Sequence, residues 1–243
     1  MKGKVHIGTS GWHSKHWVGT FYPDKTPPSK QFAYYSSVFD TVELNNPFYR
    51  LPARETFAKW KRESPKDFLF AVKANRYITH MKKLDDVEES LNTFLKHASA
   101  LENKLGPILF QLPPGWKIDI DRFATFVKLL PRDQRFVFEF RNHTWYDERI
   151  YDILEKNGCA FCIYELAGHH SPIEVTANFV YIRLHGPGAK YQGSYSTRTL
   201  NTWAKRILNW QNDRKDTYVY FDNDQAGYAA FNAGKLGEIV SKY

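Results

Sequence analysis

Two glutamates, Glu43 and Glu139, each stand near the end of a short run of β-branched and aromatic residues. Two carboxylates that face one another across a cleft can act as a general acid and a general base. His185 follows a third such run, and imidazole is the side chain that exchanges protons most readily near neutral pH. We predict catalytic roles for Glu43, Glu139 and His185. The alternative is structural, because a buried carboxylate can simply be held by a nearby cation.

Cationic side chains end several of the same runs. Lys73, Arg141 and Arg183 are suited to phosphate or carboxylate groups, which arginine can bind through two parallel hydrogen bonds. The glycine-rich segment from Gly186 to Lys190 follows the run that contains Arg183. Backbone amides in such a loop can bind phosphate, although glycines can also serve only to make a turn. These residues predict an anionic ligand.

Polar and aromatic residues near the ends of the apolar runs complete the candidate site. Aromatic faces among cations can stack on sugar rings or bases, although core packing is expected to claim about half of them. The predicted ligand-binding residues are Ser10, Trp12, Asn45, Tyr49, Lys73, His80, Gln111, Arg141, Trp145, Arg183, Gly186, Lys190, Tyr191 and Asn223.

A metal centre needs several His, Asp or Glu ligands in one cluster, and the sequence has few in suitable places. Those near the ends of the runs are Glu43, Glu139, His80, His185 and Asp222. We predict no cofactor and assign no metal ligand, with a divalent metal as the alternative. Cys159 and Cys162 would point to opposite faces of an extended strand, which argues against a zinc or redox pair.

The elements that must position these side chains are short apolar runs that alternate with amphipathic segments. This alternation is typical of parallel strands joined by crossover helices. Eight such strands within 243 residues predict a single (β/α)8 TIM-type barrel over residues 1–243, with an open doubly wound sheet as the alternative. The predicted strands are Val5–Thr9, Thr41–Leu44, Phe68–Lys73, Ile108–Leu112, Phe136–Phe140, Ala160–Glu165, Phe179–Leu184 and Tyr218–Phe221.

The longest helical stripe runs from Leu84 to Leu105, with apolar residues at steps of three and four. In contrast, the connection from Leu166 to Asn178 contains Gly168 and Pro172 and has no such stripe. The sequence therefore predicts a barrel without a regular helix between the sixth and seventh strands. In a closed barrel the polar strand ends would meet at one face, so they would form a single site.

Several of these segments together resemble the domain-of-unknown-function 72, or YecE-like, family. The resemblance covers nearly the whole chain and implies a TIM-like barrel, but it implies no settled reaction. Asp222 and the pair Glu165-Leu166 depart from the family pattern. The segments that carry the resemblance are Gly8-Thr9-Ser10-Gly11-Trp12, Phe21-Tyr22-Pro23, Glu43-Leu44-Asn45, Phe48-Tyr49, Phe70-Ala71-Val72-Lys73, Thr79-His80, Gln111-Leu112-Pro113-Pro114, Glu139-Phe140-Arg141, Trp145, Arg183-Leu184-His185-Gly186, Tyr191, Gly193 and Tyr195.

The overall charge is +8, with a sequence pI of about 9.3. A basic protein attracts polyanions, although much of this charge falls on predicted outer helices, where it can serve only to solvate the surface. The low cysteine count and the lack of a long apolar run predict a cytoplasmic protein without membrane contact.

We therefore expect an enzyme, a hydrolase or an isomerase, that acts on a small phosphorylated or sugar-like ligand or on a nucleotide. The alternative is a non-catalytic nucleic-acid-binding protein that uses its basic surface.

Overall fold

Eight parallel strands form a nearly closed barrel in the computed structural model, which describes residues 2–243. The order around the barrel is β1-β9-β8-β6-β5-β4-β3-β2, and the two-residue strand β7 pairs with β6 outside this path. The (β/α)8 TIM-type prediction is confirmed. The strands are β1 (Val5–Thr9), β2 (Thr41–Leu44), β3 (Leu69–Lys73), β4 (Leu105–Leu112), β5 (Phe136–Phe140), β6 (Ala160–Leu166), β7 (His169–His170), β8 (Phe179–Leu184) and β9 (Asp216–Phe221).

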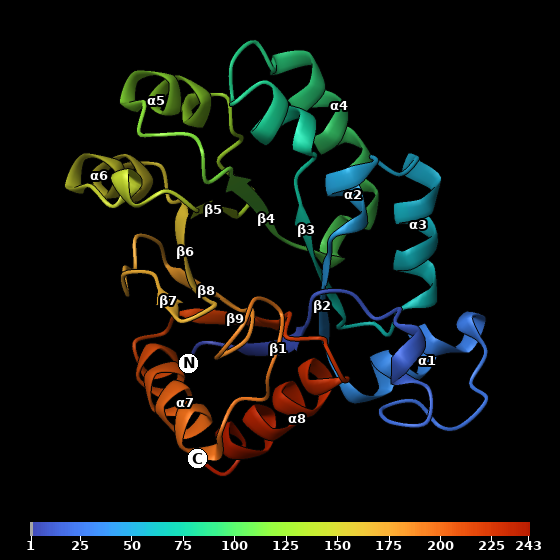
Figure 1. Cartoon of the computed structure of the whole chain (residues 1–243). Coiled ribbons are helices and arrows are strands. Elements are labelled where there is room, and N and C mark those ends of the chain that lie inside the picture. The colour runs from blue at the N-terminus through green and yellow to red at the C-terminus, as the bar shows by residue number, and fades with distance from the viewer. Residues whose placement is uncertain (1) are drawn as a thin grey trace.

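Helices surround the ring of strands, as Figure 1 shows in a view along the barrel. The α-helices are α1 (Pro28–Val38), α2 (Asn46–Tyr49), α3 (Arg54–Glu63), α4 (Glu88–Ala98), α5 (Ile120–Lys128), α6 (Glu148–Lys156), α7 (Thr197–Asn212) and α8 (Tyr228–Val240). Shorter helices are η1 (Lys15–Trp17), η2 (Tyr77–Met81), η3 (Ser99–Lys104) and η4 (His143–Trp145).

No helix connects β6 to β8 in the described structure. The chain instead turns back as β7, which pairs antiparallel with the end of β6. In Figure 1 this short hairpin lies between α6 and α7. The missing helix agrees with the prediction, because the segment has no apolar stripe to pack on the barrel.

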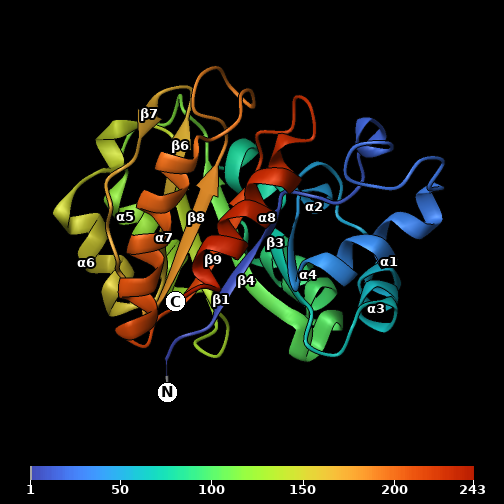
Figure 2. The same cartoon turned by 90° about the horizontal axis from the view of Figure 1, so that it is seen from below.

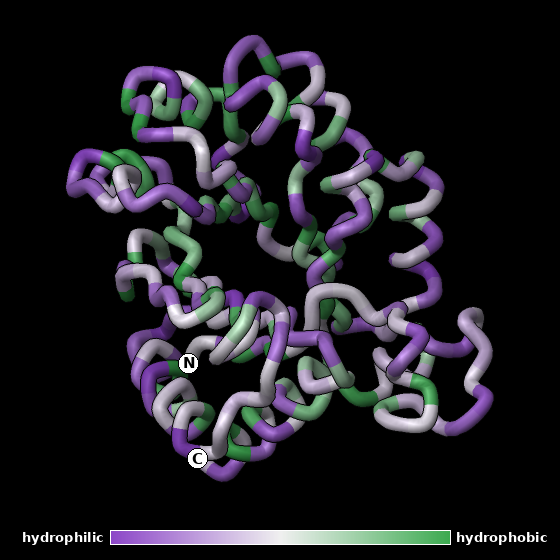
Figure 3. The backbone as a smooth tube through the Cα atoms, in the orientation of Figure 1, coloured by the Kyte–Doolittle hydropathy of each residue, from purple (hydrophilic) through white to green (hydrophobic). Residues whose placement is uncertain are grey.

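The pleat of the strands divides the core in two, because successive side chains point to opposite faces. One cluster lies between the strands and the helices and includes Phe110, Phe138 and Phe140. The other contains alternate strand residues, such as Leu109 and Val137, and fills the barrel. Figure 3 shows hydrophobic positions along the strands and again along the helices around them.

Two tyrosines complete the barrel where the strand pairing is incomplete. Between β1 and β2, the Tyr35 hydroxyl accepts a hydrogen bond from the Thr9 amide at 2.9 Å and donates one to the Thr41 carbonyl at 3.0 Å. Strands β5 and β6 pair only at their beginnings, and farther along the Tyr164 hydroxyl donates to the Phe140 carbonyl at 3.1 Å. Buried backbone groups thus find side-chain partners.

The stripe from Leu84 to Leu105 does not form one helix. Lys83, Leu84 and Asp86 have positive φ angles, so α4 begins only at Glu88, and the stripe continues through η3. Several strands also begin at different residues than predicted: β3 begins one residue later, and β4 and β9 begin earlier. None of the helices within residues 2–243 has the length and apolar character needed to cross a membrane.

Candidate active site

A layer of polar side chains lies across the barrel where the strands end. Each of the eight barrel strands contributes one residue near its end or immediately after it. The strand register places Ser10 beside Glu43 and Gln111 beside Glu139. The loops that follow β8 and β9 rise together above this end of the barrel in Figure 2. The residues of this layer, here called the charged layer, are Ser10, Glu43, Lys73, Gln111, Glu139, Tyr164, Arg183 and Asp222.

Arg183 joins the two glutamates at the centre of the layer. Its Nη1 donates to Oε2 of Glu139 and its Nη2 to Oε1 of Glu43, both at 2.7 Å. Both carboxylates are fully buried, and Arg183 is 1% exposed. Ser10 and Tyr181 also donate to Glu43, each at 2.7 Å. A buried charge requires such pairing to offset its desolvation.

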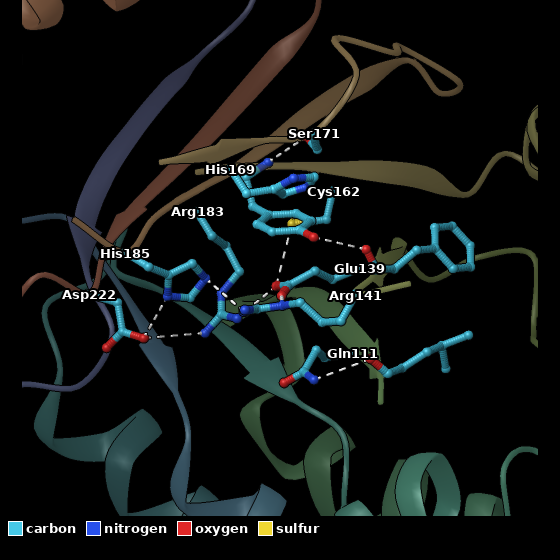
Figure 4. Close-up of polar contacts among 12 residues, drawn as sticks. Gln111, Glu139, Arg141, Cys162, His169, Ser171, Arg183, His185 and Asp222 are labelled. Carbon is cyan, nitrogen blue, oxygen red and sulfur yellow. Dashed lines mark hydrogen bonds and ion pairs between the residues drawn. The ribbon is translucent and has the colours of Figure 1, made fainter. Parts of the chain in front are cut away.

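A second set of contacts runs from Glu139 toward β9 (Figure 4). Nε of Arg141 donates to Glu139, while Nη2 of Arg141 lies 3.0 Å from Nε2 of His185. Because Arg141 is a donor, Nε2 of His185 must be the acceptor and Nδ1 carries the proton. That Nδ1 lies 2.9 Å from Oδ2 of Asp222. The imidazole is therefore neutral and connects Arg141 to Asp222.

The protonation states follow from these contacts. Burial disfavours a charged carboxyl, yet Arg141 and Arg183 hold the pKa of Glu139 well below its usual range. Burial alone would likewise raise the pKa of Asp222, but the hydrogen bond from His185 and the nearby charges lower it. Burial and the charge of Arg183 lower the pKa of His185. The layer thus contains ionised carboxylates beside a neutral imidazole.

Lys73 differs from the two arginines because it has no ionic partner. Within residues 2–243, no carboxylate lies at ion-pair distance from its Nζ and no group accepts a hydrogen bond from it. The Nζ atom lies 4.1 Å from the centre of the Phe48 ring. Burial and the charge of Arg183 lower the pKa of Lys73 to about 8.

A pocket of about 460 Å³ opens above the charged layer. It presents three cationic side chains and two carboxylates, together with amides and two phenol rings. Its lining residues are Asn45, Tyr49, Lys73, Arg183, Lys190, Tyr191, Gln192, Asp222, Asp224 and Gln225. A larger hollow of about 980 Å³ lies along α4 and η2, but no residue of the charged layer lines it, so we place the candidate site in the smaller pocket.

The structure brings together most of the predicted site residues, at two depths. Six of them line the pocket: Asn45, Tyr49, Lys73, Arg183, Lys190 and Tyr191. Others lie below or beside it, in the charged layer or in contact with it: Ser10, Glu43, His80, Gln111, Glu139, Arg141 and His185. The predicted catalytic carboxylates Glu43 and Glu139 do not line the pocket; both are fully buried and contact Arg183, which does line it.

Three further predicted residues belong neither to the pocket lining nor to the charged layer. Trp145 is fully buried between helix and barrel, where its Nε1 donates to the Trp116 carbonyl at 2.8 Å. Trp12 packs against Phe32 and Trp60. Asn223 is buried and donates to the Gly193 carbonyl and to Asn232, each at 2.8 Å. These three side chains therefore contact the outer core or hold loop backbone.

Gly186 shapes the loop that carries Lys190 and Tyr191. Its φ angle is +114°, and a Cβ atom there would lie 2.3 Å from the carbonyl oxygen of Gln192. Its amide donates to the Tyr195 hydroxyl at 2.9 Å. The role of Gly186 is thus to allow a close backbone approach.

Sequence reasoning did not select Tyr181, Gln192, Asp224 or Gln225. Tyr181 lies two residues before Arg183 on β8, so the pleat places both side chains inside the barrel. That alternation could have identified Tyr181 as a partner for a buried acid. Gln192, Asp224 and Gln225 lie on loops, and their sequence carries no comparable pattern.

In the described part of the chain, no three His, Cys, Asp or Glu side chains are grouped closely enough to hold a metal ion. Cys159 and Cys162 are free and buried, and they belong to the outer and inner core respectively. The sulfur of Cys162 lies 3.8 Å from Oε2 of Glu139.

Fold and site together define a TIM-type α/β barrel with a buried charged layer beneath a pocket at the carboxyl ends of the strands. The chain belongs to the family described as Protein of unknown function DUF72, whose pattern it matches over residues 6–243. The family expected from the sequence segments is thus confirmed.

Relatives of known sequence or structure agree with this membership. The UPF0759 protein YunF of Bacillus subtilis is 28% identical over 97% of this chain and 94% of its own. The UPF0759 protein YecE of Escherichia coli K12 is 28% identical over 45% of this chain and 38% of its own. The crystal structure of a DUF72 family protein from Thermotoga maritima has a TM-score of 0.89 and 29% identity, and covers 98% of this chain and 99% of its own.

Proposed function

We propose that this protein is an enzyme that acts on a small anionic ligand, phosphorylated or sugar-like, in the pocket above the charged layer. The observation that carries the proposal is a buried ammonium group at the pocket that has no ion pair among the described residues, whereas Arg183 is already paired with Glu43 and Glu139. Lys73, Arg183 and Lys190 line the pocket with two carboxylates, and the Lys73 ammonium has no ionic partner within residues 2–243. An uncompensated cation at the floor of a pocket favours an anionic ligand.

Lys190 is the residue we expect to bind the anionic group. It lies in the loop after β8, where barrels commonly bind phosphate. Its Nζ lies 5.2 Å from the centre of the Tyr191 ring, so a cation and an aromatic face stand side by side at the rim. Tyr49, which is 71% exposed, offers a second ring for stacking on a sugar or a base.

Asp222 is the group best placed to exchange a proton with the ligand. It lines the pocket as an ionised carboxylate, and His185 holds one of its oxygens in place. A carboxylate fixed in this way can act as a general base, as in an isomerase or a hydrolase. Glu43 and Glu139 then act as positioning residues, because both contact Arg183 and neither lines the pocket.

The test has two parts. Thermal shift measurements with sugar phosphates, sugar acids and nucleotides at fixed ionic strength should reveal ligands that raise the Tm, and Lys190→Met should weaken that effect. Each stabilising compound is then incubated with the protein, and the products are analysed by mass spectrometry with Asp222→Asn as the control. Absence of stabilisation by every anionic class would refute the proposal.

The basic surface favours a second candidate, a nucleic-acid-binding protein without turnover, because the net charge is +8 and Tyr49 is exposed beside the pocket. Anisotropy of labelled single- and double-stranded oligonucleotides across a salt series distinguishes the two candidates. Salt-dependent binding that survives Asp222→Asn, with intact strands on a denaturing gel, would favour this second function.

A further inference from the structure

Two lysines are buried among residues 2–243, and their surroundings differ. Lys104, 7% exposed, donates through Nζ to the carbonyl oxygens of Lys61, Ser64 and Pro65 at 2.9, 2.8 and 2.7 Å. Lys73, 9% exposed, has no hydrogen-bond acceptor for its Nζ among the described residues. Lys104 has the contacts of a structural lysine, whereas Lys73 lacks them.

We propose that Lys73 is a nucleophile that forms an imine with an aldehyde or ketone ligand in the pocket. The inference rests on the proposed function and narrows its substrate class to anionic carbonyl compounds. Three features of position support it: Lys73 ends β3, its side chain lines the pocket, and the Phe48 ring covers its Nζ on one side.

The surroundings favour the neutral amine that such a reaction needs. A lysine becomes nucleophilic when burial or a neighbouring cation disfavours its ammonium form. Both conditions hold for Lys73. Burial is the largest influence that lowers its pKa, and the charge of Arg183 is the next largest. Glu139, Glu43 and Asp222 oppose this effect, and the pKa of Lys73 remains lowered, at about 8. At pH 7 the fraction of neutral amine is then on the order of a hundred-fold larger than for an ordinary lysine.

The step balances without an oxidant or a reductant. The ammonium first loses a proton to water, and the amine nitrogen of Lys73 attacks the carbonyl carbon, so that the carbonyl π electrons move to oxygen. A proton passes from nitrogen to oxygen and gives a carbinolamine. Protonation of its hydroxyl then lets water leave as the C=N bond forms.

The imine gives Asp222 a defined role. Protonated C=N is a strong electron sink, so a proton on the adjacent carbon becomes acidic enough for a carboxylate to remove. Asp222 lines the same pocket and is held by His185. This arrangement suits an isomerisation or a carbon–carbon bond cleavage next to a carbonyl group.

Reductive trapping tests the proposal on the intact protein. The protein is incubated with glycolaldehyde or dihydroxyacetone phosphate in the presence of sodium cyanoborohydride, digested, and mapped by mass spectrometry. We expect a reduced adduct at Lys73, at least ~10-fold more abundant than at Lys104 or at the exposed Lys59, because the neutral amine fraction is larger. Labelling at Lys73 should rise with pH with a midpoint near 8.

Two variants sharpen the result. Lys73→Arg keeps the positive charge but cannot form an imine, so it should lose the adduct while keeping the native circular dichroism spectrum. If the variant does not fold, the distribution of adducts among the lysines of the protein without the substitution still tests the proposal. Labelling of Lys73 at or below the level of exposed lysines, or with a midpoint near 10, would overturn the inference.

Neutral glycolaldehyde separates this inference from the proposed function. It has no anionic group, so it tests the amine without requiring the anion site. Stabilisation by carbonyl-free sugar phosphates without a reduced adduct at Lys73 would support the proposed function and refute the imine. Trapping by glycolaldehyde without stabilisation by any anion would keep the reactive amine but refute the anionic substrate.

Discussion

Nδ1 of His185 donates a hydrogen bond to Oδ2 of Asp222 across 2.9 Å, and Asp222 both belongs to the charged layer and lines the pocket. The orientation of the imidazole is fixed from its other side by Arg141, at 3.0 Å from Nε2. His185 therefore connects Arg141 to Asp222, which is the carboxylate of the charged layer that lines the pocket. A neutral imidazole in this position acts as a donor with a fixed direction.

Replacing His185 by leucine should raise the pKa of Asp222. The hydrogen bond from His185 is the main influence that lowers this pKa, and leucine of similar bulk removes it. The midpoint is measured by carbon-detected NMR titration of the Asp222 carboxyl in labelled protein. An unchanged midpoint would mean that Arg183 and Lys73 alone keep the carboxylate ionised.

Tyr35→Phe should destabilise the barrel by about 1–3 kcal/mol, the usual cost of leaving buried polar groups unpaired. Its hydroxyl joins the Thr9 amide to the Thr41 carbonyl where β1 and β2 lack regular pairing. Urea unfolding monitored by tryptophan fluorescence measures the change. Tyr34→Phe is the matched control on the same helix, because Tyr34 is partly exposed. Equal effects of the two variants would show that the hydroxyl of Tyr35 is not what completes the barrel.

The sequence predicts the barrel well because each strand is a short apolar run followed by a polar residue. The same rule brings Glu43, Lys73, Glu139 and Arg183 into one layer, as found. It does not predict depth along the barrel axis. Lys73 and Arg183 reach the pocket, whereas Glu43 and Glu139 are fully buried and contact Arg183.

Loop residues are predicted less well, for a different reason. Trp145 follows β5 just as Tyr191 follows β8, yet one ring is fully buried and the other is 40% exposed. The difference arises from η4, which turns Trp145 onto Trp116 and Phe140. Such a short helix has no periodic signal in the sequence, so the direction of its side chains could not be inferred.

Gly186→Ala should weaken the stabilisation that anionic ligands confer. A Cβ atom at this position meets backbone atoms of Gln192 at 2.3 and 2.9 Å, and the φ of +114° is unfavourable for alanine. The loop that carries Lys190 must then move. Gly188→Ala is the control in the same loop, since its added Cβ would have no other heavy atom of residues 2–243 within 4 Å apart from Gly188 and its two chain neighbours. Thermal shifts with sugar phosphates compare the two variants, and an equal response in both would contradict a role for the loop geometry.

The unfolding free energy should fall as the pH decreases from about 6.5 to about 4, partly because of His80. Burial and the nearby cations Lys73, Arg76 and Arg141 lower the pKa of His80 to about 4. Between the two pKa values the unfolded chain binds the proton and the folded protein does not, so acid favours unfolding. The stability linked to His80 is thus fully present above pH 6.5.

His80→Gln should make this fall less steep, by a fraction of the ~1.4 kcal/mol per pH unit that one proton can contribute, because the ring is only half-buried. Urea unfolding at a series of pH values measures the slope for the protein and for the variant. His13→Gln, which removes an exposed histidine, should leave the slope unchanged. Carboxylates that titrate at the lower end of this range affect all three proteins alike, so the difference between slopes isolates His80. Identical slopes for the protein and for His80→Gln would show that His80 does not contribute to the loss of stability in acid.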